Sequence, residues 1–108
     1  MRIYFLTLYN LSPIQQGIQC GHAALEYVSK YKNQKYVWDF INNHKTWIIL
    51  NGWTSLSILD HIKFLENNNI EHATFQEPDL WWITTAVAFI ADETSELARY
   101  FTPNFKLA

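Results

Sequence analysis

Cysteine occurs only once in this chain of 108 residues, and glycine and proline occur three times each. A single cysteine excludes an internal disulfide and is typical of a reducing compartment, so we expect a cytoplasmic protein. No stretch rich in proline, glycine or serine interrupts the sequence as a linker would. Residues 1–108 are therefore predicted to form one domain with one modest core.

Long hydrophobic runs are also missing, since the longest are far too short to span a membrane. The apolar start, residues 1–6, is soon followed by polar residues and lacks a small-residue cleavage site, which argues against a signal peptide. We interpret it as a first strand and expect no membrane segment.

Positive charge is scarce as well. Eight lysines and arginines stand against ten acidic residues, which gives a formal net charge of −2. This balance argues against a large, general nucleic-acid footprint, because phosphate binding depends on Lys and Arg. Lys30, Lys32 and Lys35 cluster near the end of a predicted helix, where they either complement the helix dipole or contact phosphate. Lysines are common at helix C-termini, so we favour the interpretation that they complement the helix dipole.

What the chain does contain is an alternation of strand and helix patterns. The predicted strands are residues 2–9, 46–50, 72–75 and 84–91, and the predicted helices are residues 12–32, 36–44, 54–67 and 92–103. The near-continuous apolar run 46–50 is typical of a strand buried on both faces. Asp92 is the predicted cap of the last helix, and Pro103 its predicted end. The expected fold is a single α/β domain with a four-stranded mixed β-sheet flanked by helices on both faces.

The helix that follows the first strand has the most informative pattern. Ser12 is a predicted N-cap, and Pro13 suits the first helical position. At roughly 100° per residue, one narrow arc of this helix is polar, and a separate stripe is apolar and is expected to face the sheet. The polar arc is Gln15, Gln19, His22 and Glu26, and the apolar stripe is Ile14, Ile18, Gly21, Leu25 and Val28. Gly17, Gly21 and Ala24 are expected to let the helix approach the sheet closely. In an α/β sheet, sites form at the carboxyl ends of strands, where this helix begins.

The motif Gln19-Cys20-Gly21-His22-Ala23-Ala24 on this helix resembles the Gln-Cys-x-His-Ala-Ala motif of the type 2 peptidyl-tRNA hydrolases. The later segment Glu77-Pro78-Asp79-Leu80, followed by 84–88, resembles the acidic loop and threonine-containing last strand of divergent members. The resemblance covers most of the chain. It implies the fold of the type 2 peptidyl-tRNA hydrolases and their activity, hydrolysis of the ester between peptide and tRNA. It also implies that no metal or organic cofactor is needed. The spacing of His44, His61 and His72 likewise gives no sign of a metal site.

The family places a lysine on the first helix, four residues before the motif glutamine, where this chain has Gln15. The family's acidic residue corresponds to Glu77 by strand register or to Asp79 by residue type. Ester hydrolysis needs a group that takes a proton from water and donors for the oxyanion. We assign catalytic roles to His22, Glu77, Asp79 and Thr85, and substrate-binding roles to Gln15, Gln19, Thr84 and Trp82. The alternative is an inactive relative of the fold that binds a nucleotide, RNA or a protein.

The tryptophans divide into two groups. Trp38 and Trp47 sit in core-like patterns, whereas Trp81 and Trp82 are adjacent and cannot both face inward from an extended segment. An exposed indole there could stack on a terminal RNA base or a nucleotide, or could lie in an interface between two copies of the chain. The expected partners are thus tRNA or a nucleotide, and a second copy in a homodimer.

Overall fold

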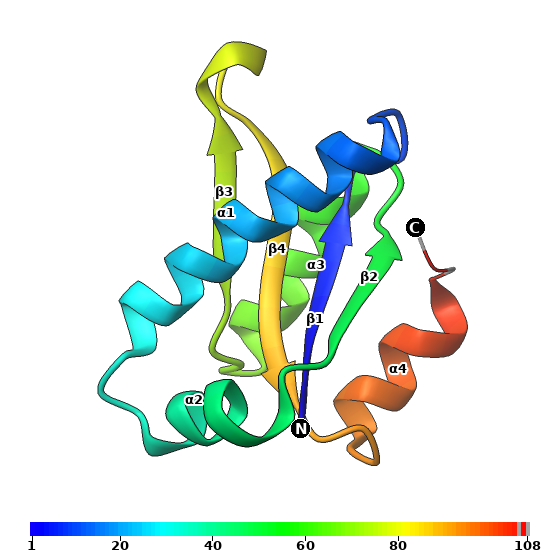
Figure 1. The fold of residues 1–108 in the computed structure, drawn as a ribbon. Coiled ribbons are helices and arrows are strands. Elements are labelled where there is room, and N and C mark those ends of the chain that lie inside the picture. The colour runs from blue at the N-terminus through cyan, green and yellow to red at the C-terminus, as the bar shows by residue number, and fades with distance from the viewer. Residues whose placement is uncertain (106, 108) are drawn as a thin grey trace.

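The computed structural model describes residues 1–105 and 107 and has one α/β domain built on a four-stranded mixed sheet (Figure 1). The strand order is β2-β1-β4-β3, where β1 is Arg2–Thr7, β2 is Trp47–Asn51, β3 is Ala73–Glu77 and β4 is Ile83–Ala91. β1 pairs with β2 in parallel, and β4 lies antiparallel to both β1 and β3. The carboxyl ends of β1, β2 and β3 therefore meet at one edge of the sheet, where β4 begins. The last two strands, β3 and β4, form an antiparallel pair.

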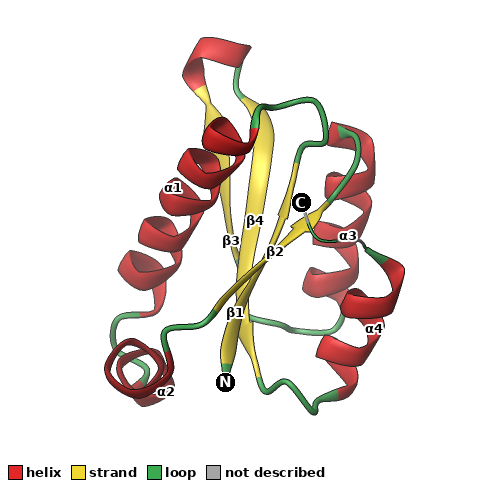
Figure 2. Cartoon of the chain, turned by 45° about the vertical axis from the view of Figure 1, so that its right-hand side comes forward, coloured by secondary structure: helices red, strands yellow, loops and turns green. Residues whose placement is uncertain are grey.

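Helices cover both faces of this sheet (Figure 2). One face carries α1 (Pro13–Tyr31), the short α2 (Lys35–Asp39) and a π-helical turn, η1 (Phe40–His44). The other carries α3 (Ser55–Asn67) and α4 (Glu96–Asn104). Fully buried aromatic rings of Tyr4, Phe5, Phe89 and Phe101 lie in the core between the layers. Within the described part of the chain, no helix combines the length and apolar character needed to cross a membrane.

Three of the helices begin at hydroxyl caps. Ser12 accepts the amide of Gln15 at 3.2 Å, as expected from the sequence, and Thr54 caps α3 in the same way. The prediction that Asp92 caps the last helix is wrong, because the cap of α4 is Ser95. The carboxylate of Asp92 instead accepts the amide and hydroxyl of Thr94 within the preceding turn. α4 also continues through Pro103, which was predicted to end it, to Asn104.

The face of α1 that packs on the sheet is not the predicted one. Its buried side chains are Gln16, Gln19, Cys20, Ala23, Ala24 and Tyr27. Ile14, Ile18 and Leu25, which were expected to face the sheet, are 76%, 45% and 71% exposed. The small residues allow a close approach, and the two buried amides have hydrogen-bond partners, so this face is compatible with burial although it is less hydrophobic.

The predicted role of two helical glycines is also wrong. A Cβ added at Gly17 or Gly21 would meet no atom within 4 Å, so neither position is needed for close packing of α1. Gly52, which follows β2, is the tight position. A Cβ there would lie 2.9 Å from a side-chain carbon of Ile58 and 3.2 Å from the backbone nitrogen of Thr7.

β2 is an edge strand, which contradicts the prediction that it is buried on both faces. Only Leu50 is fully buried, and Ile48 and Ile49 are half-buried. Trp47 and Trp38, expected in the core, are 46% and 48% exposed. The reason is that α1 packs mainly on β3 and β4, which leaves the β1–β2 half of that face partly uncovered.

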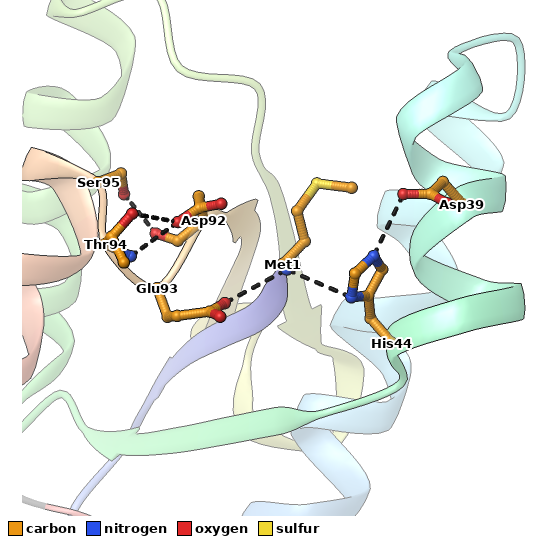
Figure 3. A network of polar contacts seen from close by, with 7 residues as sticks. All are labelled: Met1, Asp39, His44, Asp92, Glu93, Thr94 and Ser95. Carbon is orange, nitrogen blue, oxygen red and sulfur yellow. Dashed lines mark hydrogen bonds and ion pairs between the residues drawn. The ribbon is translucent and has the colours of Figure 1, made fainter.

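A polar network ties three segments together at the edge where β1 begins (Figure 3). The ammonium of Met1 lies 3.3 Å from the carboxylate of Glu93 and 3.4 Å from Nδ1 of His44. The other ring nitrogen of His44 lies 3.2 Å from Asp39. A hydrogen bond from Asn43 and the contact with His44 lower the pKa of Asp39. This network lies where β1 begins, at the opposite edge of the sheet from Glu77, which ends β3.

Candidate functional site

The candidate site lies at the edge where β1 and β3 end and β4 begins. Three side chains from different elements form one hydrogen-bonded chain there. Thr85 of β4 donates its hydroxyl to Oε1 of Gln19 on α1 at 2.5 Å. Gln19 in turn donates from Nε2 to Oε1 of Glu77, the last residue of β3, at 3.2 Å. We call these three residues the Gln19 relay. The structure thus brings together two parts of the sequence that carry the family resemblance.

Burial fixes the orientation of the side chains in the Gln19 relay. Gln19 is 2% exposed and Thr85 is fully buried, whereas Glu77 is half-buried at the surface end. A buried amide or hydroxyl is costly unless it is paired, so each member fixes the orientation of the next. A carboxylate held at one oxygen in this way presents the other oxygen in a defined direction.

A β-bulge in β4 positions Thr85. Phe75 of β3 pairs with Ala86, but the next residue, Gln76, pairs with Thr84. Thr85 therefore has no counterpart on β3, and bulges of this kind re-aim side chains next to functional sites. Its backbone oxygen remains engaged by the Thr7 hydroxyl at 3.1 Å and the Leu8 amide at 3.2 Å. The Thr85 hydroxyl reaches Gln19 and also lies 3.4 Å from the carbonyl of Phe75 on β3, while the strand stays anchored to β1.

His22 lies on α1 next to the Gln19 relay and is exposed. Its ring stacks on Phe75, with centroids 4.4 Å apart and an angle of 15° between the planes. This contact orients the imidazole without consuming a ring nitrogen. Gln15, one helical turn before Gln19, is exposed. The structure therefore places His22 and Gln15 beside the relay on the same helix.

The remaining predicted site residues lie around the β3–β4 turn. Thr84 is 7% exposed and pairs with Gln76 in the sheet. Asp79 is exposed in η2 (Pro78–Leu80), the short 3₁₀ turn after Glu77. It therefore lies outside the hydrogen-bonded chain that contains Glu77.

The turn ends in two exposed indoles. Trp81 is 92% exposed and Trp82 is 68% exposed, so neither faces inward. Both have left-handed backbone conformations, with φ of 56° and 62°. Figure 1 shows this turn projecting beyond the body of the domain. We call Leu80–Ile83 the tryptophan tip.

Sequence reasoning missed Gln16 as part of this region. Gln16 is 8% exposed, and its Nε2 donates to the carbonyl of Leu8 at 2.9 Å, which fixes the start of α1 against the end of β1. Its spacing of three residues from Gln19 places both amides on one helix face and could have revealed this role. Cys20 lies on the same buried side, and burial raises the pKa of its thiol to about 12, so it is not a nucleophile here.

The charge around the site is negative. Lys30 donates to the carbonyl of His72 just before β3 begins, at the other end of α1, and is thus far along the helix from the tip. Among the described residues, no three His, Cys, Asp or Glu side chains cluster closely enough to hold a metal ion. The site consists of amides, a hydroxyl, an imidazole and carboxylates.

No protein-family model matches this chain, and no curated protein sequence matches it either.

Proposed function

We propose that this protein hydrolyses the ester between peptide and tRNA, as the resemblance of its two motifs to the type 2 peptidyl-tRNA hydrolases implies. The observation that supports this proposal is the Gln19 relay. It joins the motif helix to the end of β3 through hydrogen bonds of 2.5 and 3.2 Å. The relay thereby joins a glutamine of the first motif to a carboxylate and a threonine of the second, which are the residue types that the resemblance assigns to the site.

Glu77 is the proposed base, because Gln19 fixes one of its oxygens and the other is free to accept a proton from water. The water oxygen attacks the ester carbonyl carbon, and its proton passes to Glu77. The tetrahedral oxyanion then collapses, the bond to the ribose oxygen breaks, and that oxygen takes the proton back. Gln15 and His22 are the proposed donors to the oxyanion. Because a neutral amide stabilises negative charge less than an ammonium does, we expect slower turnover than with the family's lysine.

The tryptophan tip is the proposed contact to the end of the nucleic acid. Trp82 is exposed beside the carboxylate-bearing turn, and base–aromatic stacking contributes about 1–3 kcal/mol per base. Stacking would supply affinity that the net charge of −2 does not.

Release of labelled peptide from a purified peptidyl-tRNA tests the proposal. We expect turnover by the wild type and a fall in kcat/KM of about 10²- to 10⁴-fold for Glu77→Gln. Asp79→Asn distinguishes the two acidic candidates and should retain most of the activity. Glu66→Gln, an exposed carboxylate on α3, is the matched control. Folded wild-type protein without turnover above background would exclude the proposal.

The second candidate function is binding without turnover, in which the same site takes a nucleotide, an RNA end or a protein. It is favoured by Gln15, which carries no ammonium where the family has one. Titration of folded wild type with a fluorescent single-stranded RNA ending in adenine tests the RNA version. The double variant His22→Ala, Trp82→Ala should lose this binding, and retention of full affinity by the variant would exclude it.

A further inference from the structure

An apolar ridge runs along the side of α1 that points away from the sheet. It consists of Ile14, Ile18 and Leu25, whose side chains are 76%, 45% and 71% exposed. At roughly 100° per residue these three positions fall within a narrow arc opposite the buried face. Single exposed apolar side chains are common, but a contiguous stripe beside further apolar surface marks an interaction site.

An apolar groove lies directly beside this ridge and has a volume of about 720 Å³. It occupies the part of the sheet that α1 leaves uncovered. Its helix wall includes Ala24 and Val28, its far wall Phe40 and Trp47, and its floor Ile3 and Ile90. Ridge and groove therefore form two halves of one continuous apolar face.

Two charged side chains flank this face. The exposed side chains of Glu26 and Lys45 have no hydrogen bond or ion pair in the part of the chain that the structure describes, although the backbone amide of Lys45 donates to the carbonyl of Phe40. Lys45 belongs to the far rim of the groove. Glu26 follows Leu25 on α1 and lies about 100° further around the helix, on the flank turned away from the groove.

We propose that this face is the interface of a homodimer, in which the ridge of each copy lies in the groove of the other. A two-fold interface uses the same patch on both copies, so it requires a surface that is complementary to itself. A ridge beside a groove of the same apolar character meets that requirement. The two-fold rotation also turns the Glu26 flank of one helix toward the rim that carries Lys45 in the other copy, so opposite charges meet on both sides.

A stable dimer needs more surface than the ridge alone supplies. α1 has 19 residues and is about 28 Å long at ~1.5 Å per residue. The ridge from Ile14 to Leu25 takes up about 16 Å of this length at ~1.5 Å per residue, in a molecule that measures 34 × 27 × 26 Å. Specific complexes bury roughly 800 Å² per partner, so the dimer must cover the groove as well as the ridge. An anionic membrane is a poorer occupant, because membrane-binding helices flank their apolar face with Lys and Arg rather than with glutamines and Glu26.

Sedimentation of the wild type and of Leu25→Glu tests this inference independently of the hydrolase proposal. We expect the wild type at twice the chain mass of 12.8 kDa and a dissociation constant raised at least tenfold by Leu25→Glu. Leu56→Glu is the matched control, since Leu56 is 74% exposed on α3, on the other face of the sheet. A monomeric wild type at high micromolar concentration would overturn the inference, as would equal dissociation constants for the two variants. Binding of a monomeric wild type to phosphatidylserine vesicles would assign the face to a membrane instead.

A charge exchange tests the orientation of the two copies. Glu26→Lys and Lys45→Glu should each weaken the dimer at low salt, because each places like charges across the interface. The double variant should recover most of the wild-type affinity. A double variant no tighter than either single one would overturn the proposed arrangement of ridge and groove.

Discussion

At the scale of single residues, the buried polar side chains carry the specificity of this fold. Within the described residues, no buried side-chain nitrogen or oxygen lacks a hydrogen-bond partner. Gln19 satisfies two partners at once, by accepting from Thr85 and donating to Glu77. An apolar residue of similar size could fill the same space but could not join α1 to both β3 and β4.

Gln19→Leu should therefore lower the free energy of unfolding by about 1–3 kcal/mol, because it removes the short hydrogen bond from Thr85, leaving that hydroxyl only the longer contact of 3.4 Å with the Phe75 carbonyl, and removes the donor to Glu77. Gln15→Leu, on the same helix but exposed, should change it by less than about 0.5 kcal/mol. Urea denaturation monitored by tryptophan fluorescence measures both changes. Similar values for the two variants would mean that the Gln19 relay contributes nothing to stability.

At the scale of elements, the sequence predicted where α1 begins but not which face it buries. Ser12 and Pro13 act locally, so their positions alone fix the start of the helix. Its orientation depends on partners that are distant in the sequence, such as Leu8 for Gln16 and Glu77 for Gln19. Hydrophobicity points to Ile14 and Leu25 as the buried side, and those residues are instead exposed. Hydrophobicity thus fails to predict the buried side of α1 at the same residues that we propose a second copy of the chain covers.

The tryptophan tip is an element kept in an unfavourable backbone conformation. A non-glycine residue with positive φ costs about 1 kcal/mol, and such strain clusters at functional sites. Trp81→Gly should therefore be more stable than Trp81→Ala by about 1 kcal/mol, since both lose the indole and only glycine relieves φ of 56°. Chemical denaturation of the two variants gives the difference directly. If Trp81→Ala is as stable as Trp81→Gly, the turn carries no strain at this position.

At the scale of the whole molecule, the alternation of strands and helices predicted the mixed sheet with helices on both faces. The order of the strands was harder to predict from the sequence, because β2 has the composition of a buried strand and yet lies at an edge of the sheet. The groove beside it, with Trp47 in its wall, explains how apolar residues come to occupy an edge position. The sequence also located the candidate site at the strand ends, but the bulge at Thr85 that assembles it depends on the pairing of β3 with β4.

The buried thiol and tyrosine hydroxyl groups of the core determine how the free energy of unfolding should respond to alkaline pH. Burial raises the pKa of Cys20 and of Tyr27 to about 12, and burial together with hydrogen bonds to Tyr27 and Glu71 raises that of Tyr36. A raised pKa means that the folded protein keeps a proton that the unfolded chain loses, so stability falls as pH rises. Their contribution is complete below about pH 8.5, the ordinary range of a thiol, and is lost progressively as pH approaches 12.

Urea denaturation between pH 8 and pH 11 checks this expectation. The free energy of unfolding of the wild type should decline across that range, most steeply above about pH 10, where tyrosines of the unfolded chain ionise. Tyr27→Phe should flatten the decline, because it removes one of the titrating groups, even though it lowers stability at every pH by removing the 2.6 Å hydrogen bond to Tyr36. Tyr9→Phe, at an exposed position, should leave the slope unchanged. Parallel curves for the wild type and Tyr27→Phe would show that burial of this hydroxyl does not link folding to proton loss.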